Sequence, residues 1–177
     1  MMMEKVDKYL RRFKGGVEVR EATVDDIATC AAFAFQNLVE YGLVTLEKSA
    51  ENEAAIERLV SFALDVLLKR VPGVIQVAEE DGVVAGMVYC QPAGPDLWDG
   101  VEVCAISFLY VIPEFRKNPA VALSLMRTAL QEGLSWGYKR FRVTIDDAHH
   151  HLIERYEDKF EFRLDFTHRS YSIDTED

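Results

Sequence analysis

Cysteine is scarce in this chain, which has three among 177 residues. The odd number and the positions Cys30, Cys90 and Cys104 match neither a disulfide framework nor the paired spacing of a structural metal site. Each lies in an apolar segment, so we expect buried thiols in a reducing compartment. The three histidines at 149–151 are consecutive and would point about 100° apart on a helix, so we expect no metal site there.

Long apolar runs and excess positive charge are also missing. No stretch approaches the roughly 18 continuous apolar residues of a membrane-spanning helix, and segment 1–16 lacks the apolar core of a secretory signal. Lys and Arg number 20 against 30 Asp and Glu, a formal charge of −10. A general nucleic-acid binder would instead have a basic patch. We therefore expect a cytoplasmic protein without nucleic-acid or membrane partners, and slightly favour cationic substrates.

The apolar residues that are present suffice for one substantial core, since 49% of the chain is hydrophobic. Val6, Leu10 and Phe13 recur at helical spacing, which predicts an amphipathic helical extension over 1–16. Its apolar face would pack on the domain or on a second subunit, so a homodimer and a monomer both stay open. Segment 17–177 shows no linker or repeat and is interpreted as a single domain.

Hydrophobic periodicity predicts an alternation of strands and helices. Helices are expected from Thr23 toward Gly42, over 46–70, over 119–136 and over 148–156. Strands are expected over 17–20, 74–78, 83–90, 101–111, 140–145 and within 160–173. A β-α-β unit runs from 101–111 to 140–145 and predicts a parallel pair, whereas the Asp81-Gly82 turn predicts an antiparallel hairpin. The fold class is α/β, with a mixed, mostly antiparallel sheet and helices on both faces.

The most informative stretch is 107–120, SFLYVIPEFRKNPA. An apolar strand leads through a short basic loop into a helix, with Asn118 as N-cap and Pro119 in the first helical position. Free N–H groups and the helix dipole at such a junction favour anions, and Arg116 and Lys117 add positive charge. The pattern predicts a phosphate site and hence a phosphorylated cofactor. The alternative is a solvated basic pair beside an ordinary helix cap.

With this motif, the order of elements resembles the GCN5-related N-acetyltransferase (GNAT) family over about 17–173. The loop signature of that family is Arg or Gln, two residues, Gly, one residue, then Gly or Ala, and segment 116–121 here is RKNPAV. Arg116 matches, and the Val-x-Pro pattern that precedes it in the family is present as Val111-Ile112-Pro113. Pro119 and Val121 replace the two small residues. The resemblance implies a GNAT-like α/β fold with a splayed parallel strand pair. It also implies transfer of an acyl group, usually acetyl, from acyl-coenzyme A to an amine.

The resemblance further implies acetyl-CoA as co-substrate, with no metal. Strand amides would hold the pantetheine arm and polarise the acyl carbonyl, and the basic loop would bind the pyrophosphate. The residues implied in cofactor binding are Leu109, Tyr110, Val111, Arg116, Lys117, Asn118, Ala120 and Val121. Because Pro119 has no N–H and the Asn118 cap competes for an amide, we expect coenzyme A binding to be retained but weakened.

For proton transfer, the family's second signature aligns best with Phe160-Glu161-Phe162. Glu157 then stands where the family has its tyrosine, and Tyr156 lies one position earlier. Both stay open as the acid for the leaving thiolate, Tyr156 through a one-residue helical extension and Glu157 through a pKa raised by burial. Candidate bases for the amine are Glu102, at the start of a strand, and Asp146 and Asp147, at the end of the next, and spacing alone does not choose among them. Glu79 and Glu80, at a hairpin turn, are weaker candidates. The alternatives are a core-edge position for Tyr156 and solvated positions for Glu157 and Glu102.

The predicted function is therefore transfer of acetyl from acetyl-CoA to a small-molecule or peptide amine, by direct attack in a ternary complex. The altered glycine motif and the displaced tyrosine leave an alternative function open. In this alternative the chain is a catalytically inactive acyl-CoA-binding regulatory or scaffold module of the same fold. An α/β hydrolase is disfavoured because the chain has no Gly-x-Ser-x-Gly elbow.

Overall fold

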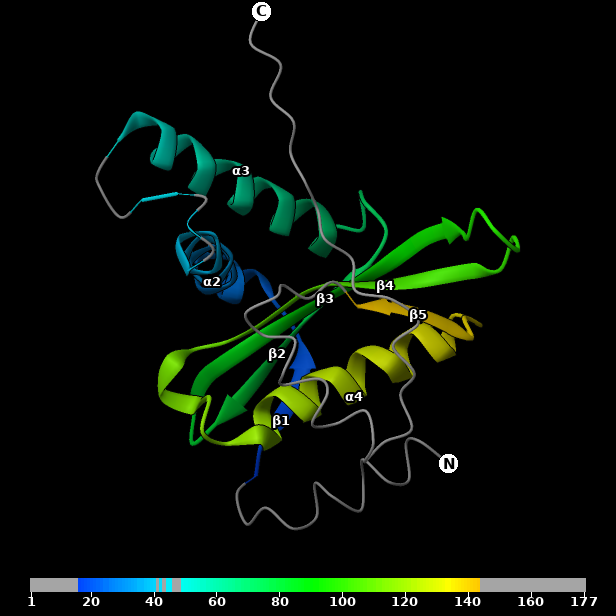
Figure 1. Cartoon of the computed structure of the whole chain (residues 1–177). Helices are drawn as coiled ribbons and strands as arrows, with labels where there is room; N and C mark the ends of the chain where they lie inside the picture. The colour runs from blue at the N-terminus through cyan, green and yellow to red at the C-terminus, as the bar shows by residue number, and fades with distance from the viewer. Residues whose placement is uncertain (1–15, 41, 43, 46–48, 144–177) are drawn as a thin grey trace, which may run out of the picture.

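The computed structural model describes residues 16–40, 42, 44–45 and 49–143, in which one five-stranded sheet forms the centre (Figure 1). The strands are β1 (Glu18–Glu21), β2 (Val74–Glu80), β3 (Val83–Pro95), β4 (Glu102–Val111) and β5 (Arg140–Val143). They lie side by side in chain order. Neighbours are antiparallel except β4 and β5, which are parallel. The predicted mixed, mostly antiparallel sheet is confirmed.

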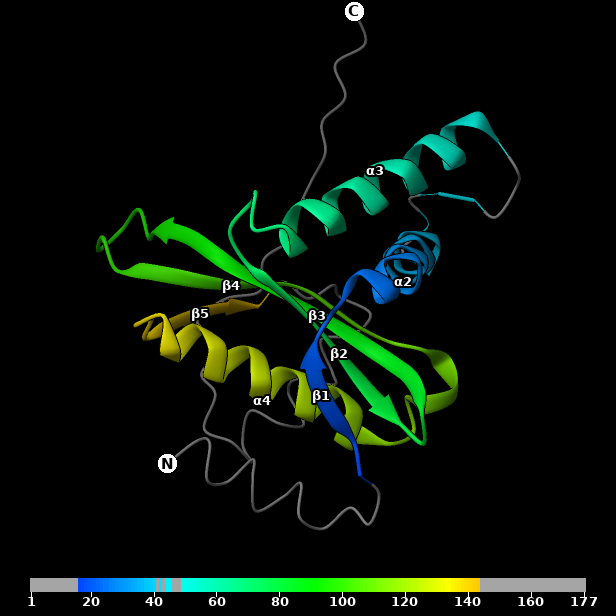
Figure 2. The ribbon, with the colours of Figure 1, turned by 180° about the vertical axis from the view of Figure 1, so that it is seen from behind.

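Helices cover both faces of this sheet, as the sequence predicted. Helices α2 (Ile27–Glu40) and α3 (Ala50–Leu67) lie on one face, and α4 (Pro119–Ser135) lies on the other (Figures 1 and 2). Short 3-10 helices precede α2 and α4, at Val24–Asp26 (η1) and Pro113–Phe115 (η2). Helix α3 is shorter than the predicted 46–70. It is capped by Ser49, whose hydroxyl oxygen accepts a hydrogen bond from the N–H of Asn52.

The β2–β3 hairpin turns where the sequence predicted it. Asp81 and Gly82 have φ angles of 53° and 77°, the left-handed pair that a tight hairpin of this hand requires. Farther along β3, Gly86 is needed for a different reason. A Cβ at this position would lie 2.5 Å from the carbonyl oxygen of Tyr110 on β4. The close approach of β3 and β4 at this point therefore excludes any side chain.

The two faces of the sheet have separate apolar cores. Along β2, Val74 faces α4, and the next residue, Ile75, faces α2 and α3. Cys90 and Cys104 belong to the α4 core and Cys30 belongs to the other. All three cysteines are buried and free, as predicted. Burial raises the pKa of Cys30 to about 12, so this thiol packs as a small neutral group.

The start of α2 is joined to the sheet by an ion-pair network around Arg20 of β1. The Arg20 guanidinium donates to both carboxylate oxygens of Asp26, at 2.7 and 3.0 Å, and its Nε donates to Glu79 of β2 at 2.9 Å. The N–H of Thr23 also donates to Asp26, at 2.7 Å, which confirms the helix start predicted there. Asp26 is buried, and these hydrogen bonds, led by those from Arg20, lower its pKa to about 2.

Several predicted elements lie outside the described residues. They are the N-terminal extension, apart from Gly16, the helix over 148–156 and the strands within 160–173. Within the described part, no helix is long and apolar enough to cross a bilayer. The same residues contain no group of three or more His, Cys, Asp and Glu side chains arranged to hold a metal ion.

Candidate functional site

The predicted cofactor residues lie at the end of β4 and in the loop that follows it. The described register of β4 with β5 runs from Val103 and Arg140 to Ile106 and Val143, where the described residues end, and β4 is paired with β3 as far as Val111. Among the described residues, no strand pairs with 107–111 on the β5 side. We call this side of residues 107–111 the β4 edge.

A β-bulge lies where this edge begins. Tyr89 is opposite Phe108 and Cys90 is opposite Ile106, so Ser107 is an extra residue on β4. Such a bulge bends the strand and strengthens its local twist. The bulge directly follows Ile106, which pairs with Val143 of β5. No sequence motif had indicated it.

Alternation along the strand decides which amides face the β4 edge. The N–H of Ile112 donates to the carbonyl of Ala85 on β3, at 3.0 Å. Backbone groups of successive strand residues point to opposite sides. By that alternation the N–H of Tyr110 points toward β3, and the N–H groups of Leu109 and Val111 point toward the β4 edge.

The loop before α4 has the predicted cap, and the cap uses most of the loop's donors. Asn118 Oδ1 accepts from the N–H of Ala120, at 3.0 Å, and the Asn118 carbonyl accepts from the N–H of Val121, at 3.3 Å. The N–H of Asn118 itself donates to Phe115, at 3.0 Å. Of the four predicted loop amides, only that of Lys117 has no acceptor among the described residues. In this arrangement the N-terminus of α4 is largely satisfied by its own loop.

A carboxylate also lies at this helix start. Asn118 Nδ2 donates to Oε1 of Glu80, at 2.8 Å. The second oxygen of Glu80, Oε2, is buried and has no hydrogen-bond partner in the part of the chain that the structure describes. The positive end of the α4 dipole favours an anion here. Glu80 therefore places a negative charge beside the position predicted for the cofactor phosphates.

Arg116, the residue that matches the loop signature, is engaged in a cluster that the sequence did not indicate. Its Nη2 donates to both carboxylate oxygens of Glu40, at 2.8 and 2.7 Å, and its Nε donates to the Val111 carbonyl, at 2.8 Å. The guanidinium also lies over the ring of Tyr110, 5.3 Å from its centroid. The Tyr110 hydroxyl donates to Glu40, at 2.9 Å. Burial, with a smaller contribution from Glu40, raises the pKa of Tyr110 to about 12.

The Glu40–Arg116–Tyr110 cluster connects the end of α2 to the loop before α4. Its acid and base are 76 residues apart in the chain. No periodicity or local motif pairs residues at that separation, so the role of Glu40 was not predicted. The cluster holds Arg116 through three kinds of contact, so a phosphate ligand would have to compete with Glu40 for the guanidinium.

Of the three candidate catalytic residues Glu102, Tyr156 and Glu157, only Glu102 lies among the described residues. Glu102 is exposed at the first position of β4. At about 3.3 Å per residue, the seven residues from Glu102 to Leu109 separate Glu102 from the Leu109 amide on the β4 edge by roughly 23 Å. Tyr156 and Glu157 lie outside the described residues, as do the alternative bases at 146–147.

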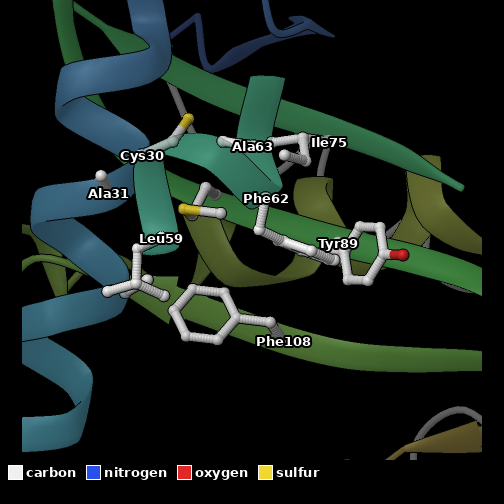
Figure 3. Close-up of a pocket in the computed structure, with 10 residues that line it drawn as sticks. Cys30, Ala31, Leu59, Phe62, Ala63, Ile75, Tyr89 and Phe108 are labelled. Carbon is white, nitrogen blue, oxygen red and sulfur yellow. The ribbon is translucent and has the colours of Figure 1, made fainter. Parts of the chain in front are cut away.

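A small pocket opens between α2, α3 and the sheet, on the face opposite α4 (Figure 3). Its volume is about 110 Å³. It is lined by Cys30, Ala31, Ala34, Leu59, Phe62, Ala63, Ile75, Met87, Tyr89 and Phe108. Phe108 belongs to β4 and immediately precedes Leu109, so the pocket and the β4 edge are adjacent features of one strand.

Comparisons with known proteins identify relatives of this arrangement. The sequence model of the acetyltransferase (GNAT) family matches residues 47–162. No curated protein matches the chain. Among solved structures, a transcriptional regulator from Bacillus halodurans C-125 is 15% identical with a TM-score of 0.69, over 89% of this chain and 100% of its own.

Two similar structures were solved with coenzyme A or acetyl-CoA. A predicted acetyltransferase from Clostridium acetobutylicum, solved with acetyl-CoA, is 13% identical with a TM-score of 0.66, over 91% of this chain and 96% of its own. An aminoglycoside N-acetyltransferase in complex with CoA is 14% identical with a TM-score of 0.64, over 92% of this chain and 97% of its own. At such identities the likeness establishes the fold.

Proposed function

This chain belongs to the acetyltransferase (GNAT) family, and we propose that it transfers an acetyl group from acetyl-CoA to an amine by direct attack in a ternary complex. Membership rests on the family match over residues 47–162. The β4 edge is the structural observation that most supports the activity, because it offers aligned backbone donors without a strand partner among the described residues.

The N–H groups of Leu109 and Val111 are the proposed acyl-binding donors. Amides two residues apart on a strand are roughly 6.6 Å apart, so one would donate to the acyl carbonyl oxygen and the other to the pantetheine arm. Negative charge that develops on the acyl oxygen during attack would be stabilised by its donor. A single fixed donor of this kind contributes about 3 kcal/mol in well-studied enzymes. Because Tyr110 directs its own N–H toward β3, its proposed part is to support Arg116 through its ring, at 5.3 Å from the guanidinium carbon.

For the pyrophosphate, we propose the side chains of Arg116 and Lys117 and the N–H of Lys117. The amides of Asn118, Ala120 and Val121 would contribute only if the cap around Asn118 rearranged, since each already has an acceptor. Binding at this loop therefore competes with Glu40 for Arg116 and with Glu80 for the start of α4. This supports the weakened affinity expected from the loss of the two small residues.

The proton-transfer residues are also proposals. Tyr156 and Glu157 are the candidates for protonating the leaving thiolate. Glu102 is a candidate base that would need a chain of water molecules or an extended acceptor, given its distance from the β4 edge. A small-molecule amine is the proposed acceptor class, a choice that the similarity to acetyltransferases of aminoglycosides favours. The cytoplasmic location and the homodimer also stay predictions.

The second candidate function is a non-catalytic acyl-CoA-binding or scaffold module. It is favoured by the pairing of Arg116 with Glu40 and by the loop amides that are already satisfied. In that case the fold would keep its architecture with little or no affinity for the cofactor. The two functions share one structure and differ in ligand binding and turnover.

Calorimetric titration with acetyl-CoA and with free CoA tests both, followed by thiol release with a panel of amines. Saturable binding and thiol release with one of the amines would support the transferase. Binding without turnover of any amine would point to the regulatory module. If millimolar ligand gives no heat of binding, the acetyltransferase proposal is wrong and the scaffold function holds.

A further inference from the structure

We propose that the α2–α3 pocket binds a compact apolar group of the acceptor, so that the acceptor is a primary amine with a branched alkyl or aryl substituent. This inference rests on the proposed acetyltransferase function and adds a substrate class to it. It starts from the position, the size and the lining of the pocket (Figure 3).

Small side chains on the two helices create the pocket. Ala31 and Ala34 on α2 and Ala63 on α3 leave space that Leu59 and Phe62 border (Figure 3). The resulting volume is about 110 Å³. An apolar cavity of about 150 Å³ in another protein stays dry and binds benzene. A phenyl ring or a short branched alkyl chain is therefore the scale of group that this pocket takes.

The lining offers almost no polar partner. The Cys30 thiol is neutral, because burial raises its pKa to about 12. The Tyr89 hydroxyl lies 3.0 Å from the carbonyl oxygen of Pro72 and 2.7 Å from Gln91 Oε1, so its hydrogen bonding is already satisfied. No lining residue is charged. A cationic or polyhydroxylated group would lose its hydration here without gaining a partner, whereas an apolar group would be stabilised.

The pocket and the proposed acyl-binding donors share strand β4. Phe108 lines it from β4, and the next residue, Leu109, is a proposed acyl-binding donor. One strand step is about 3.3 Å. The other sheet residues of the lining, Ile75, Met87 and Tyr89, lie on β2 and β3, so the pocket extends from Phe108 away from the β4 edge. A substituent in the pocket would therefore need a short linker that carries the amine past the Phe108 side chain to the β4 edge. The expected substrates are therefore amines with an apolar substituent, unlike the polar, cationic aminoglycosides named with some structural neighbours.

Methionine methyl groups allow binding to be measured without any turnover. Met87 lines the pocket, and Met126 packs against the α4 core on the opposite face of the sheet. In protein labelled with ¹³C at the methionine methyls, we expect 2-phenylethylamine and 3-methylbutylamine to shift the Met87 signal saturably. Met126 should not shift, and an aminoglycoside should leave both signals unchanged.

Two substitutions on α2 connect the pocket to the reaction. Ala34→Phe fills the pocket, and Ala32→Phe adds the same side chain at an exposed position of the same helix. With Ala34→Phe we expect acetylation of 2-phenylethylamine to lose about tenfold or more in kcat/KM, the cost of excluding one aryl group, with acetyl-CoA affinity unchanged. Ala32→Phe should stay within about twofold of the parent. Phe62→Ala, at a side chain that is already 43% exposed, should instead accept bulkier amines.

The outcomes separate this inference from the function on which it rests. Acetyl-CoA binding and thiol release with amines that leave Met87 unshifted would overturn the pocket assignment and leave the transferase intact. The assignment would also be overturned if Ala32→Phe and Ala34→Phe lowered kcat/KM equally. A Met87 shift without turnover of any amine would refute the acceptor role. A Met87 shift that Ala34→Phe abolishes, together with the tenfold kinetic loss, would support the assignment.

Discussion

Replacing Glu40 with glutamine should strengthen coenzyme A binding while it weakens the fold. The substitution keeps an oxygen that accepts from the Tyr110 hydroxyl, which now donates to Glu40 at 2.9 Å. It removes the negative charge that holds Arg116 at 2.7 Å. Under our proposal, Arg116 must leave that carboxylate to contact a cofactor phosphate. Releasing the guanidinium beforehand therefore favours the bound state.

The size of the effect follows from the exposure of the pair. The side chains of Arg116 and Glu40 are 39% and 24% exposed, so solvent screens the pair and about 0.2–1 kcal/mol is appropriate. If all of this energy opposes cofactor binding, its removal lowers the dissociation constant by up to about fivefold. The same loss should lower the melting temperature by up to about 2–4 °C for a chain of this size.

The assay is calorimetric titration with free CoA, paired with thermal unfolding of the same samples. Glu114→Gln is the matched control, because Glu114 is exposed in the same loop, forms no ion pair with a described residue and carries the same charge. Its affinity for CoA shows how much binding gains when one negative charge is removed near the phosphates without releasing Arg116. In an Arg116→Gln background, the benefit of Glu40→Gln should vanish, since the two residues act as one unit.

The reasoning would be refuted by a Glu40→Gln variant that binds CoA with unchanged or lower affinity than the parent. Equal gains from Glu40→Gln and Glu114→Gln would refute it too, because net charge alone would then explain the change. In either case Arg116 serves to fasten α2 to the loop before α4, and the phosphates are bound elsewhere.

Three further predictions concern the helix start, the sheet and pH. Glu80→Gln should raise CoA affinity by removing the carboxylate beside the α4 N-terminus; weaker binding in titration would contradict competition between Glu80 and phosphate. Gly86→Ala should cost about 1–3 kcal/mol of folding stability, since its Cβ would lie 2.5 Å from the Tyr110 carbonyl oxygen. Gly16→Ala, whose Cβ would have no described atom within 4 Å, should unfold like the parent in a thermal melt. Asp26 has its pKa lowered from 3.8 to about 2, so its stabilisation of about 2 kcal/mol is present above pH 4 and is lost as pH falls through about 2. Urea titrations should therefore show the parent's advantage over Asp26→Asn at pH 6 disappear near pH 2; a constant difference would count against this ion pair.

The fold was predictable where its signals are local. Asp81-Gly82 requires only two adjacent residues that tolerate positive φ, and Asn118-Pro119 caps a helix through a bond two residues away. The strands flanking these features alternate or run apolar for the same local reason. The parallel pair β4–β5 also followed from the order of elements, since α4 connects two strands of one sheet.

The candidate site was predictable only in part. The positions of Leu109, Val111 and Arg116 at a strand end and loop were evident from 107–120, but what each of them contacts was not. Arg116 was predicted to be available to a phosphate and is paired with Glu40. The Asn118 cap was predicted to compete for one amide, and the loop around it satisfies three.

The sequence by itself determined the order of elements, the strand-loop-helix junction and the family resemblance, because these depend on neighbours within a few residues. Only the tertiary structure decided where a bulge bends β4 against β3, which carboxylate holds Arg116 and where the alanines of α2 and α3 leave a pocket. Each of these brings together residues that lie far apart in the chain, from Cys30 to Phe108 in the pocket and from Glu40 to Arg116 in the cluster. Ion pairing and packing depend on distance in space, and no periodicity along a chain specifies that distance.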